Sequence, residues 1–267
     1  YGFLRFSLPM FPDAVKDTSS LNLSYLTFGI MDYEFGILHL MVFLSIVGII
    51  YGALVAMMQK DAKKLIAYSS VSHLGFCMLG LFALNPNGIN GSILQQINHG
   101  ITTGALFLII GVVYERRHTR EISEYGGLSH VMPGFAVIFL IITMASIGLP
   151  LLNGFIGEFT ILAGAFQVHW SWGVWGCAGI VLGAAYMLWL YQRMMFGEVS
   201  NPKNKVLNDL NIREYATLVP LVVMCFWIGI YPKPFFEIIE KPVQKIVQRV
   251  QPDFDNRSES GVARLPK

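Results

Sequence analysis

The chain has 267 residues, of which 54% are hydrophobic and only 13% are charged. A soluble domain carries roughly 25% charged residues, so this composition excludes an ordinary soluble protein and indicates an integral membrane protein. The net charge of +2 gives no reason to expect a nucleic-acid partner. The chain begins at Tyr1, inside an apolar segment and without a methionine or signal peptide, so we expect the C-terminal part of a longer protein.

Apolar stretches long enough to cross a bilayer recur along the chain, because about 20 such residues suffice. Residues 1–12 form the end of a first span and residues 13–35 a polar loop. Further spans are predicted at residues 36–58, 62–84, 91–114, 170–195 and 215–230. Between them, residues 85–90 read as a tight turn and residues 115–127 as a charged loop.

Residues 133–166 are too long for one straight span. Pro150 and Asn153-Gly154 divide this stretch, which predicts a discontinuous helix. From Lys233 onward, apolar residues recur near helical spacing with basic residues between them, as in a helix that lies along a membrane interface. Residues 253–267 are expected to be disordered.

The predicted fold is therefore an all-α integral membrane bundle. It has about six to seven transmembrane helices, one of them broken near Pro150, and an amphipathic C-terminal helix. Residues 1–232 form the transmembrane part, and residues 233–267 form the amphipathic helix and tail. Lysine and arginine gather in the loops on one side of the bundle, which the positive-inside rule makes cytoplasmic. The basic C-terminal arm falls on the other side and is an exception.

Glu158 is the strongest candidate for a functional residue. It lies in the broken apolar stretch, and a carboxylate at membrane depth is costly to bury and therefore indicates function. A carboxyl group poised between desolvation and a nearby cation can load and release a proton. The structural alternative is an ion pair or a cap at the helix break.

Polar residues share one face of the predicted span at residues 91–114: Gln95, Gln96, His99, Thr102 and Thr103. Histidine suits a proton relay because its ordinary pKa is near 6.5. In the preceding span, Ser69, Ser70 and His73 again share a face, and Lys63 lies about 15 Å along the helix from His73. Each histidine could instead be structural, and Lys63 could be a snorkelling anchor.

The sequence has no glycine-rich phosphate loop, no HExxH motif and no cysteine set for an iron–sulfur cluster. Cys77, Cys177 and Cys225 lie in apolar segments, so we expect all three to be buried. We therefore predict neither a metal site nor a redox cofactor in this chain.

Four ordered motifs stand out along the chain: Gln59-Lys-Asp-Ala-Lys-Lys-Leu-Ile-Ala-Tyr-Ser-Ser-Val-Ser-His-Leu-Gly-Phe76, Asn98-His-Gly100, Tyr114-Glu-Arg-Arg-His-Thr-Arg120 and Asn153-Gly-Phe-Ile-Gly-Glu-Phe159. Together they resemble the proton-pumping, antiporter-like membrane subunits of respiratory complex I, within them the subunit M group and its mitochondrial counterpart, subunit 4. Related subunits L and N, and the multi-subunit sodium/proton antiporters, usually carry lysine where this chain has Glu158, and subunit M carries glutamate.

The resemblance implies proton translocation within NADH:quinone oxidoreductase. It makes Glu158 the terminal proton site, His99 and His73 relay groups, and Lys63 a connection toward one aqueous side. It also implies flavin and iron–sulfur clusters in partner subunits, contacts with other membrane subunits, and a multi-pass location in a bacterial inner membrane. Further glutamate and lysine sites of the family would lie upstream of Tyr1.

Two alternatives stay open at this point. The first is a subunit of a multi-subunit sodium/proton antiporter. The second is a passive membrane scaffold whose polar residues only pack helices.

Overall fold

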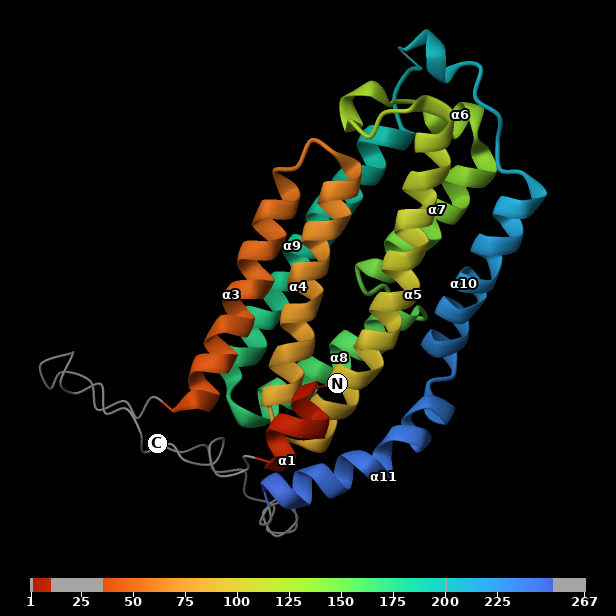
Figure 1. Cartoon of the computed structure of the whole chain (residues 1–267). Coiled ribbons are helices and arrows are strands. Elements are labelled where there is room, and N and C mark those ends of the chain that lie inside the picture. The colour runs from red at the N-terminus through yellow and green to blue at the C-terminus, as the bar shows by residue number, and fades with distance from the viewer. Residues whose placement is uncertain (1, 11–35, 200, 252–267) are drawn as a thin grey trace, which may run out of the picture.

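Every named element is helical in the part of the chain that the computed structural model describes, which is residues 2–10, 36–199 and 201–251 (Figure 1). The elements are η1 (Phe3–Ser7), α1 (Leu8–Met10), α3 (Ile37–Met57), α4 (Ala62–Phe82), α5 (Pro86–Arg117), η3 (Ile122–Glu124), α6 (Leu128–Val131), α7 (Pro133–Ser146), α8 (Asn153–Val168), α9 (Trp170–Met195), η4 (Pro202–Asn204), α10 (Ile212–Ile230) and α11 (Lys233–Val250). The polar loop predicted at residues 13–35 and the disordered tail predicted at residues 253–267 lie outside the described residues.

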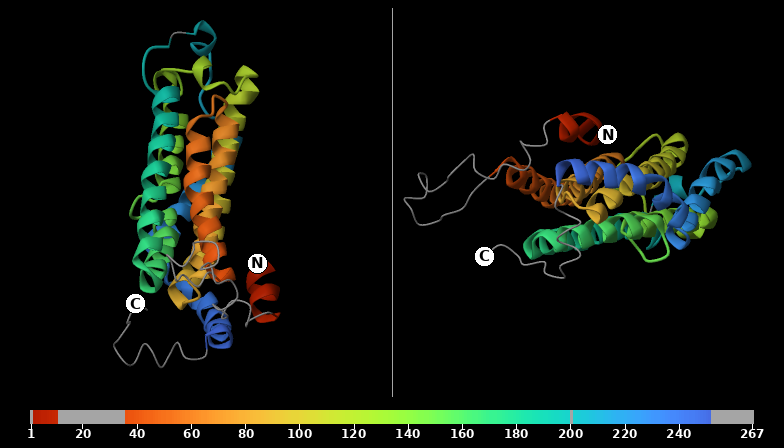
Figure 2. Two further views of the ribbon diagram at one scale, coloured as in Figure 1. Left: turned by 90° about the vertical axis from the view of Figure 1, so that its left-hand side faces the viewer. Right: turned by 90° about the horizontal axis from the view of Figure 1, so that it is seen from below.

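Five of the described helices are long and apolar enough to cross a membrane, namely α3, α4, α5, α9 and α10. The bounds of α3, α4 and α9 agree with the predicted spans to within two residues at each end. α3 and α4 form a hairpin, and α9 packs against α3 beside it (Figures 1 and 2). The prediction of an all-α, multi-pass membrane bundle is thus confirmed.

The predicted discontinuous helix is also confirmed. α7 ends at Ser146 and α8 begins at Asn153. Between them Gly148 and Leu151 have φ angles of +77° and +74°, which lie outside the range of a right-handed helix. α7 has 14 residues and is therefore about 21 Å long, too short to cross about 30 Å of hydrocarbon alone. The two half-helices together make one crossing (Figure 1), and the side chains of Leu149 and Leu151 in the break are exposed.

The tight turn predicted at residues 85–90 is wrong, because α5 already begins at Pro86. The Asn85 side chain caps this helix and accepts a hydrogen bond from the backbone N–H of Gly88 at 2.7 Å. Asn-Pro is typical of turns, but proline also fits the first position of a helix. The chain reverses one residue earlier, at Leu84, which has a φ angle of +52°. α5 also runs on to Arg117, so the predicted charged loop begins later than expected.

α11 lies across the lower end of the bundle in the view of Figure 1, against the start of α5 and close to α1 (Figure 2). Its inner face buries three valines, and its outer face exposes three basic residues: Val243, Val247, Val250, and Lys241, Lys245, Arg249. This arrangement confirms the predicted amphipathic helix. Its burial against the bundle explains how a short polar segment stays helical.

Two hydrophobic clusters fill the interior. The upper cluster includes Ile66 of α4 and Ile109 of α5, and the lower cluster includes Phe76 of α4 and Ile89 of α5. The polar section of both helices therefore lies between two apolar layers. Among the cysteines, Cys77 and Cys225 are buried as predicted, but Cys177 is exposed on α9. An apolar sequence segment does not say which side of a helix faces outward.

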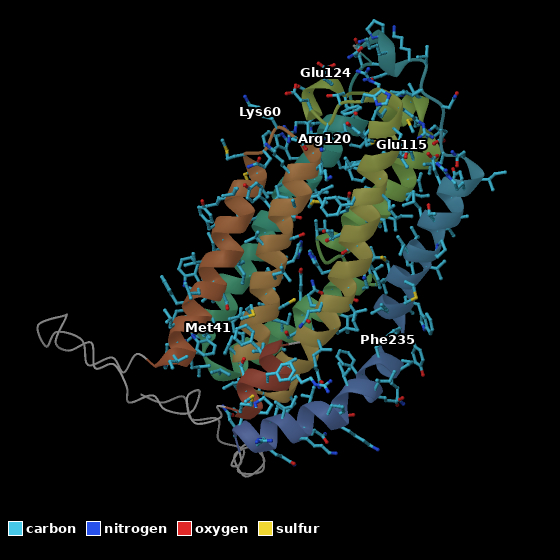
Figure 3. The ribbon with its side chains drawn as sticks, in the orientation of Figure 1. Met41, Lys60, Glu115, Arg120, Glu124 and Phe235 are labelled. Carbon is cyan, nitrogen blue, oxygen red and sulfur yellow. The ribbon has the colours of Figure 1, made fainter. Side chains whose placement is uncertain are left out.

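Charged residues gather at the upper end, where Figure 3 labels Lys60, Glu115, Arg120 and Glu124. There the Arg116 guanidinium donates to both oxygens of the Glu214 carboxylate at 2.8 Å. Such bidentate pairing is among the stronger hydrogen-bonded arrangements in proteins. It ties the end of α5 to the start of α10.

The start of α7 is held from a distant part of the chain. The Asp209 carboxylate accepts hydrogen bonds from the backbone N–H groups of Gly134 and Phe135 at 2.7 and 3.0 Å. Met132, the residue before the helix, offers no capping side chain. Asp209 therefore satisfies helix donors that α7 cannot satisfy itself, and so fixes the half-helix that leads to the break.

We expect Gly157→Ala to destabilise the packing of α8 on α5. A methyl group there would overlap the Gln95 side-chain oxygen and lie 3.0 Å from Nδ2 of Asn98. Overpacking of this kind typically costs about 1–3 kcal/mol. Thermal unfolding of the full-length protein in detergent measures the loss as a lower midpoint. Gly48→Ala is the control, because its added methyl group would make only an ordinary contact, 3.9 Å from the Cα of Gly75; an equal loss in Gly48→Ala would contradict this account.

We expect Asp209→Ala to lower the same unfolding midpoint by an amount equivalent to about 0.5–2 kcal/mol, the usual cost of a lost helix cap. Asp209→Asn should retain most of the stability, because asparagine also accepts bonds from helix N–H groups. Equal losses in the two variants would show that the negative charge matters rather than the cap.

Candidate functional site

Glu158 is the sixth residue of α8, just beyond the helix break, and only 3% of its surface is exposed. Its Oε1 lies 3.0 Å from Nδ1 of His73 on α4 and accepts a hydrogen bond from Nε2 of Gln95 on α5, also at 3.0 Å. Three helices thus bring one polar group each to the same point. The buried carboxylate has an imidazole and an amide as partners, which is the condition for keeping it at this depth.

His73 stands between Glu158 and the second predicted relay residue. Its ring centroid is 5.4 Å from that of His99 on α5. Thr103 lies one turn along α5, with its hydroxyl 3.1 Å from Nδ1 of His99. The structure therefore brings Glu158, His73 and His99 together in that order, although His99 is only half-buried. Nε2 of His73 is buried and has no hydrogen-bond partner among the described residues.

Lys63 lies apart from this cluster. It is exposed in the first turn of α4, at the charged upper end of the bundle. Ten residues of helix separate it from His73, which corresponds to about 15 Å. The structure therefore does not bring Lys63 into contact with the other predicted residues, and its role stays a prediction.

The residues of the polar face predicted on α5 differ in how deeply they are buried. Gln95 and Thr102 are buried, but Gln96 and His99 are half-buried. The Thr102 hydroxyl donates to the backbone carbonyl of Asn98 at 3.0 Å, so the helix itself satisfies it. Of the predicted stripe, only Gln95 contacts Glu158 directly.

Asn98 is a positioning residue that the pattern of polar residues did not single out. Its Nδ2 donates to the backbone carbonyl of Asn153 at 2.7 Å and lies 3.4 Å from Oε1 of Gln95. It therefore holds both the first residue of α8 and the amide that binds Glu158. In the sequence, Asn98 could have been identified as a second amide, about one turn after Gln95, in an apolar span.

A small cavity lies beside the Glu158 carboxylate. The groups that line it come from α4, α7, α8 and α9, and they include Ser72, His73, Ser146, Glu158 and Tyr186. It has about 10 Å³ of room for the centres of water molecules. Gly148, in the break, lies so close that an added methyl group would be 3.0 Å from Oε2 of Glu158. Tyr186 is fully buried here and was not predicted.

This arrangement can hold and release a proton without leaving an unpaired charge in the buried site. When Glu158 and His73 share one proton, they form either a neutral pair or an ion pair, and both are compatible with a buried site. A second proton makes the pair cationic, and that charge can pass toward His99. Within the described residues, no three His, Cys, Asp or Glu side chains are placed to hold a metal ion.

The family described as "NADH:quinone oxidoreductase/Mrp antiporter, TM" matches residues 20–184. NADH-quinone oxidoreductase subunit M of Rhodobacter capsulatus is 44% identical over 95% of this chain and 46% of its own length. NADH-ubiquinone oxidoreductase chain 4 of Marchantia polymorpha is 44% identical over 93% of this chain and 46% of its own. The chain thus spans about half the length of the curated relatives it matches.

Among solved structures, a chain of respiratory complex I from Thermus thermophilus with bound NADH superposes with a TM-score of 0.81. It is 30% identical in sequence, and the match covers 93% of this chain and 48% of that one. Sequence and fold agree on the relationship that the motifs predicted. The chain belongs to the NADH:quinone oxidoreductase/Mrp antiporter family of membrane proteins.

Proposed function

We propose that the protein translocates protons as a membrane subunit of NADH:quinone oxidoreductase. The observation that carries the proposal is the buried cluster of Glu158, His73 and Gln95 directly beyond a broken membrane helix. Irregular backbone at membrane depth is tolerated where it is buried in protein or lines a wet cavity. A titratable pair at such a place is suited to passing an ion.

Glu158 is the group that loads and releases the proton, and His73 and His99 relay it. A proton that arrives at His99 passes to the neighbouring ring of His73, 5.4 Å away between ring centroids, and then to Glu158, which is 3.0 Å from Nδ1 of His73. Because Nε2 of His73 has no hydrogen-bond partner among the described residues, the first step needs a bridging water molecule or a rotation of one ring. Gln95 keeps the carboxylate aligned by donating to the same oxygen that faces His73. Release from Glu158 returns the cluster to its shared-proton state.

The energy for this transfer comes from outside the chain. Moving one elementary charge against 100 mV costs about 2.3 kcal/mol, so proton transfer across an energised membrane requires an external drive. We assign that drive to redox reactions in partner subunits, where flavin and iron–sulfur clusters reside. Other membrane subunits of the complex are therefore the direct partners of this protein.

We further propose that the upper end of the bundle faces the cytoplasm. The basic residues Lys60, Lys63 and Lys64 lie there, together with those at the end of α5 (Figure 3). This bias follows the positive-inside rule. In this orientation Lys63 marks the cytoplasmic approach to the α4 polar groups, and α11 lies on the opposite surface.

The first experiment is Glu158→Gln in the assembled complex, with proton uptake into membrane vesicles and NADH oxidation measured together. We expect proton pumping, or turnover with it, to fall by roughly tenfold or more, because a positioned proton-transfer group typically contributes at least that much. Glu240→Gln, at an exposed glutamate of α11, is the control and should be unaffected. Normal pumping by an assembled Glu158→Gln complex would make Glu158 a structural carboxylate and favour a passive scaffold.

The second candidate function is a subunit of a multi-subunit sodium/proton antiporter, because the matched family includes both groups. The two functions differ in their need for sodium. We expect proton translocation to proceed at the same rate when choline replaces sodium in the vesicle medium. A requirement for sodium, with sodium moving opposite to protons, would favour the antiporter.

A further inference from the structure

The cavity beside Glu158 is bounded on one side by α9. Gly179 and Gly183 of that helix line it, and Tyr186 completes its wall. A methyl group added at Gly183 would be 3.9 Å from the Tyr186 hydroxyl, so the phenol oxygen stands at the edge of the space that the glycine leaves. No part of the proposed relay uses α9.

The Tyr186 hydroxyl is in an unfavourable position unless something binds it. The residue has no exposed surface, and its oxygen makes no hydrogen bond of good geometry to any described residue. Ser69 of α4 is its polar neighbour, but the contact does not meet hydrogen-bond geometry. Because the Ser69 hydroxyl donates to the backbone carbonyl of Ile66 at 2.7 Å, it could offer the phenol only an acceptor. Burying a hydroxyl without a partner costs about 1–3 kcal/mol, so such a group usually binds an ordered water molecule.

A second unsatisfied group borders the same cavity. His73 lines it, and Nε2 of His73 is buried without a partner among the described residues. The cavity has about 10 Å³ of room for water centres, close to the 10–15 Å³ that one water molecule needs. One water could therefore bind both the phenol and the imidazole. His73 and Gln95 both contact Oε1 of Glu158, which leaves Oε2 for the water.

We propose that Tyr186 is a positioning residue of the proton site, which holds one water molecule against the Glu158 carboxylate. The phenol O–H donates to the water, and the water donates to Oε2. This additional donor stabilises the ionised form of Glu158 and so sets the pH at which the carboxylate takes up a proton. The proposal rests on the proposed function of Glu158 as a proton site.

Other titratable groups also act on Glu158, and none of them replaces Tyr186. His73 and Cys77 come from α4, and His99 from α5. α7 presents Ser146, which does not titrate, and the buried titratable side chains of α10 are Cys225 and Glu214, the latter at the upper end. Tyr186 is the cavity-lining residue that can donate a hydrogen bond from the side of α9.

The test is Tyr186→Phe, which keeps the ring and removes only the hydroxyl. In the assembled complex, infrared difference spectra follow the protonated carboxyl band of Glu158, assigned by its loss in Glu158→Gln. We expect the pH of half-protonation to rise by about one unit in Tyr186→Phe, a tenfold change in proton affinity. A band from a weakly hydrogen-bonded water should disappear at the same time.

Tyr191→Phe is the matched control. Tyr191 is also buried on α9, but its hydroxyl donates to the backbone carbonyl of Ala136 at 3.2 Å, away from the cavity. This variant should leave the Glu158 band and the water band unchanged. An unshifted or lowered half-protonation pH in Tyr186→Phe, or an equal rise in Tyr191→Phe, would overturn the proposal. Because the readout is titration, it separates this proposal from a failure of the pumping function.

Discussion

The contact between the Glu158 carboxylate and the His73 imidazole, 3.0 Å apart, is the constraint on which the rest of the bundle depends. A carboxylate cannot stay ionised in an apolar interior without partners. α4, α5 and α8 must therefore converge at one level, because His73 and the amide of Gln95 reach Glu158 only there. Gly157 allows that convergence, since any side chain at its position would meet Gln95.

The helix break leaves backbone N–H and C=O groups without helical partners, and these groups need other hydrogen bonds. Local bonds satisfy some of them: the N–H of Leu149 donates to the carbonyl of Met144, and that of Leu152 to the carbonyl of Leu149. Asn98 holds the start of α8 from α5 by donating to the carbonyl of Asn153. The same helix thus supplies both Gln95 for the carboxylate and Asn98 for the break, so the two features are parts of one structure.

The sequence predicts the spans, the break and the three central residues of the site, because length, proline and a buried charge are local signals. It does not predict which amide reaches Glu158 or that Tyr186 lines the cavity, since both depend on how the helices are turned toward one another. The turn predicted at residues 85–90 is wrong because Asn85-Pro86 fits a turn and a helix cap equally well. Lys63 shares a helix with His73, but a shared helix does not bring two residues to the same depth.

The position of the cluster between two apolar layers decides how a proton can reach it. Along α4 the polar section ends at Ile66 above and Phe76 below, and both side chains are buried. Along α4 itself, an apolar layer therefore separates the polar groups from each end of the helix. The least buried member of the cluster is His99, on the side of α5 where Gly100 has open space around it. Under the proposed function, protons would reach the cluster sideways through His99, and the rest of the path would come from residues that pack against this side of α5.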